Sequence, residues 1–166
     1  KNRIGLFPLG ECKNKIINII EHDDDIRALI TGDENFTGKL KYNHVYDSLV
    51  IDLSLKKAKT YITIDAVVSS IESRKIKGIE ITIDIFTDLS SIDLTFDEQK
   101  KYYSMGYFGN RIDTLTDMLY RKLSGNKDFG IGELQLKPRN PMNIFQPQAK
   151  YYGKALVFQM FDFRVV

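Results

Sequence analysis

The side chains best suited to chemistry in this sequence are carboxylates in segments with strand-like alternation. Asp65, Glu80 and Asp84 occupy alternate positions in runs of β-branched residues, and Glu133 lies in a third such run. Convergent carboxylates of this kind are what two-metal phosphoryl transfer requires. The residue two positions after Glu133 is glutamine, however, and not the lysine that completes the familiar nuclease pattern. A small metal-dependent nuclease is therefore an alternative interpretation, and it requires Asp84 and Glu133 to lie within metal-bridging distance.

Three other motifs do not support catalysis. Residues 128–132 read DFGIG, but no glycine-rich loop, lysine strand or catalytic loop of a kinase accompanies this tripeptide. Residues 106–110 read GYFGN, which lacks the spacing of phosphate and dinucleotide loops. The two histidines, His22 and His44, have no partners at the spacing of a metal or catalytic site. We expect no catalytic residue, no metal site and no cofactor.

The strand acids have a second interpretation that involves no catalysis. Because Asp65, Glu80 and Asp84 alternate with apolar residues, we expect them on the face of a sheet that is turned away from its helices. In a ring-shaped assembly with that face inward, these acids would line the channel. Their negative charge would repel passing DNA and prevent it from binding.

The clearest predicted element is a helix that begins after Asn110. This residue is a good N-cap, and Asp113 stands three positions later, where an acid meets free N–H groups. Four apolar residues then recur at spacings of three and four: Ile112, Leu115, Leu119 and Leu123. Such a stripe needs a sheet to cover it. Gly125 is suited to the left-handed stop after the helix.

The remaining pattern predicts two further helical segments and a sheet. A helix begins at about residue 11, and the acids at residues 23–25 indicate either a kink or a second helix capped by Asp23. Five segments have strand-like composition: residues 48–55, 60–71, 79–87, 131–137 and 154–165. Residues 1–10 are predicted to be an extended N-terminal arm. Residues 87–106 and 138–153 are predicted to be projecting loops. The first of these loops has a possible short helical turn, and the second is alternatively an open hairpin.

These elements indicate an α+β fold in a single domain covering residues 11–166. Clean alternation in the strands favours a mostly antiparallel sheet with helices on one face, because parallel strands would be apolar on both faces. The 166 residues are the size of one domain, and a net charge of +2 gives no global basic field for nucleic acid. No apolar run is long enough to span a bilayer, so a membrane is not an expected partner.

Four segments together resemble small neck and tail-completion proteins of tailed bacteriophages and of prophages of low-GC Gram-positive bacteria. These segments read GYFGNRIDTLTDML, NKDFGIGELQLK, KIKGIEITIDIFTD and YYGKALVFQMFDF. The chain is most similar to the tail terminator group. This resemblance implies a structural virion protein that forms a ring, typically a hexamer, which caps the tail tube and docks the head connector. A neck adaptor with a larger, twelvefold ring is the alternative.

The resemblance also implies the partners: copies of the same chain, the tail tube protein and the connector proteins, with DNA passing through without specific binding. Assembly in the bacterial cytoplasm and a final place in the virion neck are expected. The surface that we expect to contact a neighbour is the proline-bearing segment 138–153, with its exposed-type apolar residues. These are Met142, Ile144, Phe145, Tyr151 and Tyr152.

Overall fold

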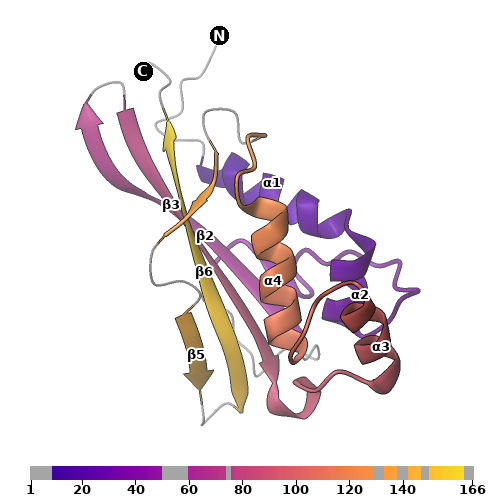
Figure 1. The fold of residues 1–166 in the computed structure, drawn as a ribbon. Helices are drawn as coiled ribbons and strands as arrows, with labels where there is room; N and C mark the ends of the chain where they lie inside the picture. The colour runs from indigo at the N-terminus through magenta and orange to yellow at the C-terminus, as the bar shows by residue number, and fades with distance from the viewer. Residues whose placement is uncertain are drawn as a thin grey trace.

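The protein is a single α+β domain in which helices cover one face of a mostly antiparallel sheet (Figure 1). The computed structural model describes residues 9–49, 60–73, 76–128, 133–137, 142–146 and 150–162. Its α-helices are α1 (Leu9–Glu21), α2 (Asp24–Thr31), α3 (Phe96–Ser104) and α4 (Arg111–Leu123). A short 3₁₀-helix, η2, spans Leu89–Ser91. No helix in the described part of the chain has both the length and the apolar character needed to cross a bilayer.

Three long strands form the centre of the sheet. The strands are β1 (Val45–Tyr46), β2 (Thr60–Ser73), β3 (Ile76–Asp88), β4 (Gln135–Leu136), β5 (Met142–Gln146) and β6 (Tyr151–Asp162). Their order is β1-β2-β3-β6-β4, and β5 also pairs with β6. The pair β1 and β2 is parallel, whereas the other pairs are antiparallel. In Figure 1 the β2 and β3 hairpin extends past the helical layer as an arm.

Helix α4 is the central covering element, as its apolar stripe predicts. Its four predicted stripe residues are completely buried: Ile112, Leu115, Leu119 and Leu123. They pack against the isoleucines of β3 and the apolar side of β6, which belong to the same core cluster. Asn110 and Asp113 form a reciprocal capping box, with hydrogen bonds of 2.9 and 3.1 Å. Gly125 adopts a φ of 74°, which confirms the predicted left-handed stop.

The acids at residues 23–25 separate two helices, α1 and α2. Of the two predicted alternatives, a kink or a second helix, the second helix is present. The Asp23 side chain accepts a hydrogen bond from the Ile26 N–H at 2.9 Å and so caps α2. The first helix begins at Leu9, so the two last residues of the predicted 1–10 arm are helical. Residues 1–8 lie outside the described residues, and their extended conformation stays a prediction.

Both predicted projecting loops contain regular structure. The 87–106 segment holds η2 and the nine-residue helix α3, because Thr95 and Glu98 form a full capping box. The 138–153 segment contains β5 and the start of β6, which form an antiparallel hairpin, so of the two predicted alternatives the hairpin is the one present. The last strand starts at Tyr151, three residues before its predicted start.

Two predicted strands fall only partly within the described residues. Of residues 48–55, the described Ser48 and Leu49 lie in a bend, and the short strand β1 lies before them instead. Of residues 131–137, only Gln135 and Leu136 pair as β4. The other residues of these two segments either lie outside the described part of the chain or have no ladder partner.

Arg111 joins four elements from a buried position. Its guanidinium makes two hydrogen bonds to the Glu98 carboxylate, at 2.7 and 2.8 Å. It also donates to the carbonyl oxygens of Leu29 in α2 and Ser91 in η2, each at 2.8 Å. Because one planar group satisfies all these acceptors, it fixes the start of α4 against α2, η2 and α3.

Candidate functional site

The three strand acids lie on the sheet face opposite the helices. In the ladder, Asp84 pairs with Thr63, Asp65 pairs with Thr82, and Glu80 pairs with Val67. Their sequence neighbours in these strands are Ala66 and buried isoleucines, which belong to the core beneath the helices. The structure therefore brings these acids onto one face, over two adjacent strands. Their role as a channel lining stays a prediction.

Lysines oppose two of the three acids. Lys13 of α1 lies 3.7 Å from the Asp65 carboxylate, and Lys137 forms an ion pair with Glu80. Asp84 is half-buried, and burial raises its pKa above the usual value of an aspartate. The negative charge expected on this face is thus partly neutralised, and Asp84 is held in surroundings that disfavour its ionised form.

The acids required by the nuclease interpretation do not converge. Asp84 pairs with Ala155 of β6, while Glu133 precedes β4, whose Gln135 pairs with Gln159. Four residues of strand separate those two β6 positions, which corresponds to roughly 13 Å. Within the described residues, no group of three or more histidine, cysteine or carboxylate side chains is placed to hold a metal ion.

The two tyrosines predicted for an interface make contacts within the subunit. Tyr151 contacts Phe86 and Tyr61 edge-on, with ring centroids 5.8 and 6.2 Å apart. Tyr152 is partly buried against the main core. Their role in an interface stays a prediction, but any such contact must leave this ring cluster intact. The other three predicted interface residues lie in β5, where only the backbone is described.

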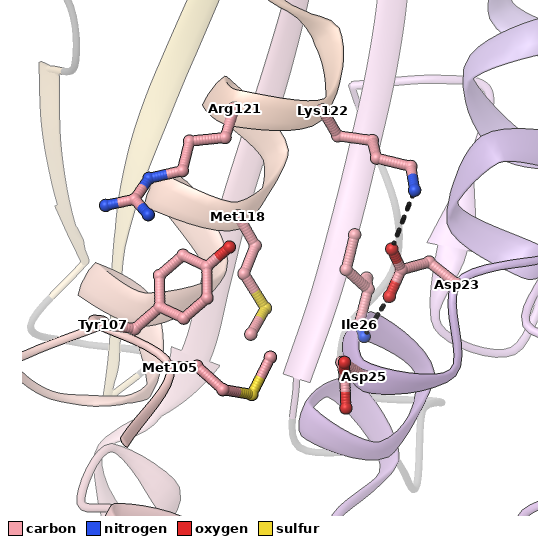
Figure 2. Close-up of a pocket in the computed structure, with 8 residues that line it drawn as sticks. All are labelled: Asp23, Asp25, Ile26, Met105, Tyr107, Met118, Arg121 and Lys122. Atoms are coloured by element: carbon pink, nitrogen blue, oxygen red, sulfur yellow. Dashed lines mark hydrogen bonds and ion pairs between the residues drawn. The ribbon is translucent and has the colours of Figure 1, made fainter. Parts of the chain in front are cut away.

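A pocket between α2 and α4 is lined by charged side chains around two methionines and an isoleucine (Figure 2). Each charged group already has a partner. Lys122 pairs with Asp23 at 3.2 Å, and Arg121 stacks over the Tyr107 ring at 4.6 Å and pairs with Asp117 at 2.9 Å. The Lys122–Asp23 pair joins α4 to the start of α2, whereas the Arg121 contacts stay within α4 and the turn before it. The pocket is part of the packing between these elements.

Exposed aromatic side chains lie along α3 and at the turn that follows it. Phe96 and Tyr103 stand seven residues apart and so lie on one side of α3, and Phe96 is 80% exposed. The Phe108 ring lies 5.4 Å from that of Tyr103 and is also exposed. We call these three residues the aromatic patch. Large apolar side chains held in water are typical of surfaces that contact other macromolecules.

A second surface, the side of β2 that faces away from β3, is only partly covered by the described residues. Strand β1 covers it only at Ile62 and Thr63. In the described chain no strand lies beside Ile64–Val68, and we call these five residues the open β2 edge. Val67 is 48% exposed, and Ile71 just beyond is 68% exposed. Unpaired backbone N–H and C=O groups along such a strand are a template for pairing with another chain.

Sequence reasoning missed both of these surfaces and the Arg111 anchor. The possible helical turn predicted within residues 87–106 is present as α3, but its start at the Thr95 and Glu98 capping box, and with it the aromatic patch, was not predicted. Nothing in the local pattern distinguishes buried Arg111 from an exposed helix arginine, since its four acceptors come from distant segments. An open edge is a property of the sheet order and has no local signal.

Comparison with known proteins gives one family. The model of the family described as YomW matches residues 14–160, which includes α2, α3, α4, most of α1 and nearly the whole described sheet. A search of curated proteins finds no match.

Proposed function

The chain belongs to the YomW family, and on this premise we propose that it is a structural subunit of a tailed phage particle. The family name comes from a gene of a Bacillus phage or prophage of the SPβ type and indicates a phage-associated protein. Several copies form a ring that ends the tail tube and joins it to the head connector. The ring is a hexamer located in the neck of the virion. Its partners are the tail tube protein and the connector proteins.

The observation that carries this proposal is the one-sided architecture of the sheet. Helices α1 and α4 cover one face, while Asp65, Glu80 and Asp84 share the other. A ring with this second face inward directs carboxylates towards its channel, where they discourage DNA from adhering. Lys13 and Lys137 reduce this repulsion, so the lining is weakly acidic and does not bind the passing strand.

Exposed apolar surfaces on the subunit support assembly. A rotational ring uses two different surfaces of each subunit, and the contact must close to avoid filaments. Val67 and Ile71 of β2 are exposed and suit one such surface. The aromatic patch suits a contact with a different neck or tail protein, because it projects from α3, away from the edges of the sheet.

The mass of the particle in solution tests this proposal. Native mass spectrometry and sedimentation velocity of the purified chain are expected to give a closed particle of six 19.1-kDa subunits. Twelve subunits would favour a neck adaptor over a tail terminator. A monomer at every concentration, also in the presence of tail tubes, would contradict the ring. A variant with Phe96→Ser and Phe108→Ser is expected to keep the ring but lose binding to its neck partner.

A further inference from the structure

A groove lies between α4 and β6 on the helical side of the sheet. Its volume is about 280 Å³, and described residues of α4, β4 and β6 line it. We propose that this groove binds a small neutral group that has a ring-sized apolar body and one hydroxyl, as a phenol has. This binding site goes beyond the assembly role proposed above and does not depend on it.

The walls of the groove are mainly apolar. Leu136 of β4 and Leu156 of β6 line it from the sheet, and Tyr120 lines it from α4. Sites for small molecules commonly have volumes of roughly 300–1,000 Å³, so this groove is close to the lower limit. The occupant is therefore small, and an apolar ring can pack against the Tyr120 side chain.

The charged groups at the groove neutralise one another. The Lys154 ammonium lies 2.6 Å from the Asp113 carboxylate. Asp117 pairs with Arg121 at 2.9 Å. A charged ligand would lose its hydration here while these opposite charges are already paired, and that loss is costly. A neutral ligand avoids this cost.

Thr116 places a buried hydroxyl beside the groove. This residue lines the groove and is only 5% exposed, and within the described chain its hydroxyl has no hydrogen-bond partner. Threonine in a helix divides between two rotamers, so rotation about χ1 can turn the hydroxyl towards the groove. A buried hydroxyl without a partner costs free energy, and a ligand oxygen that bonds to it removes this cost. The ligand hydroxyl is therefore assigned to Thr116.

Binding of p-cresol to the purified chain tests the site. In methyl spectra of leucine-labelled protein, the signals of Leu136 and Leu156 are expected to shift, whereas that of Leu29 in α2 should not. N-acetyl-tyrosine amide presents the same phenol as a peptide would. Tighter binding of this amide would identify a tyrosine of a partner protein as the source of the phenol, and tighter binding of p-cresol a free small molecule. Shifts with neither probe would overturn the proposal.

Two threonines of α4 provide matched variants. Thr116→Val removes the hydroxyl at nearly constant volume and should weaken p-cresol binding about fivefold. Toluene, which lacks the hydroxyl, should bind Thr116→Val at least as tightly as the wild type. Thr114→Val is the control, because the Thr114 hydroxyl is also buried without a partner in the described chain but lies outside the groove.

The control variant should bind p-cresol as the wild type does. Equal affinity of the wild type and Thr116→Val for p-cresol would overturn the assignment of the ligand hydroxyl, and so would an equal loss in both variants. The methyl signals report on a single subunit, whether or not it belongs to a ring. Failure of this site is therefore distinguishable from failure of the proposed assembly, which the particle mass decides.

Discussion

Replacing Glu98 by alanine is expected to destabilise the whole helical layer through Arg111. The Arg111 side chain is only 8% exposed, and Glu98 supplies two of its four hydrogen bonds. Removing one partner of a buried ion pair costs about 3–5 kcal/mol, since the other charge remains desolvated and unpaired. Because the Glu98 side chain is 19% exposed and water can reach the vacated site, we expect a loss of about 3 kcal/mol.

This loss can be measured by urea unfolding, and by a fall in Tm of roughly 6–12 °C for a chain of this length. Two controls separate the causes. Asp117→Ala removes the partner of Arg121 in an exposed ion pair and should cost about 0.5 kcal/mol or less. Thr95→Ala removes the other half of the α3 capping box and should cost about 1 kcal/mol. A Glu98→Ala loss no larger than that of Thr95→Ala would refute the role assigned to Arg111.

The pH dependence of the free energy of unfolding tests the same role of Glu98 independently. Burial by itself would raise the pKa of Glu98, but hydrogen bonds from Arg111 and from the Thr95 backbone outweigh it, and the pKa is lowered. A carboxylate with a lowered pKa stabilises the fold above its unfolded pKa, and this contribution is lost as the pH falls through the folded pKa. The difference in stability between wild type and Glu98→Ala should therefore be largest near neutral pH and shrink below about pH 4.

Three further predictions concern the core and the sheet. Leu119→Ala should cost about 2–5 kcal/mol in urea unfolding, because it leaves a cavity beneath α4. Gly153→Ala should lower expression and Tm sharply, since the added Cβ would collide with the Ile85 carbonyl oxygen in the neighbouring strand, whereas Gly10→Ala, with open space around it, should not. Asp84→Asn should stabilise the fold at pH 7 but not at pH 3, because the raised pKa of this acid means that its ionised form opposes folding.

Helix α4 could be predicted from sequence because all its signals are local. Its cap, its apolar stripe and its glycine stop lie within residues 110–125, and each acts on its own neighbours. The β3 alternation is equally local, and burial of its isoleucines on one face follows from period two. The face of the three strand acids could be predicted for the same reason.

The hairpin of β5 and β6 was harder to predict from the sequence because the segment contains several prolines. Pro141 and Pro147 flank the five residues of β5, so the strand is short and lies at the edge, where proline is tolerated. Gly153 carries a signal that was overlooked, since a glycine inside a strand often marks a close approach of another backbone. Contacts made across the fold, such as those of Arg111, have no counterpart in the local sequence.

Electron microscopy of tail tubes mixed with the purified chain tests the central proposal most directly. Tubes assembled without their terminator are expected to acquire a ring of this protein at the end that faces the head, and to bind connectors only after it is added. Tubes that remain uncapped by an otherwise folded wild-type protein would contradict its assignment to the neck.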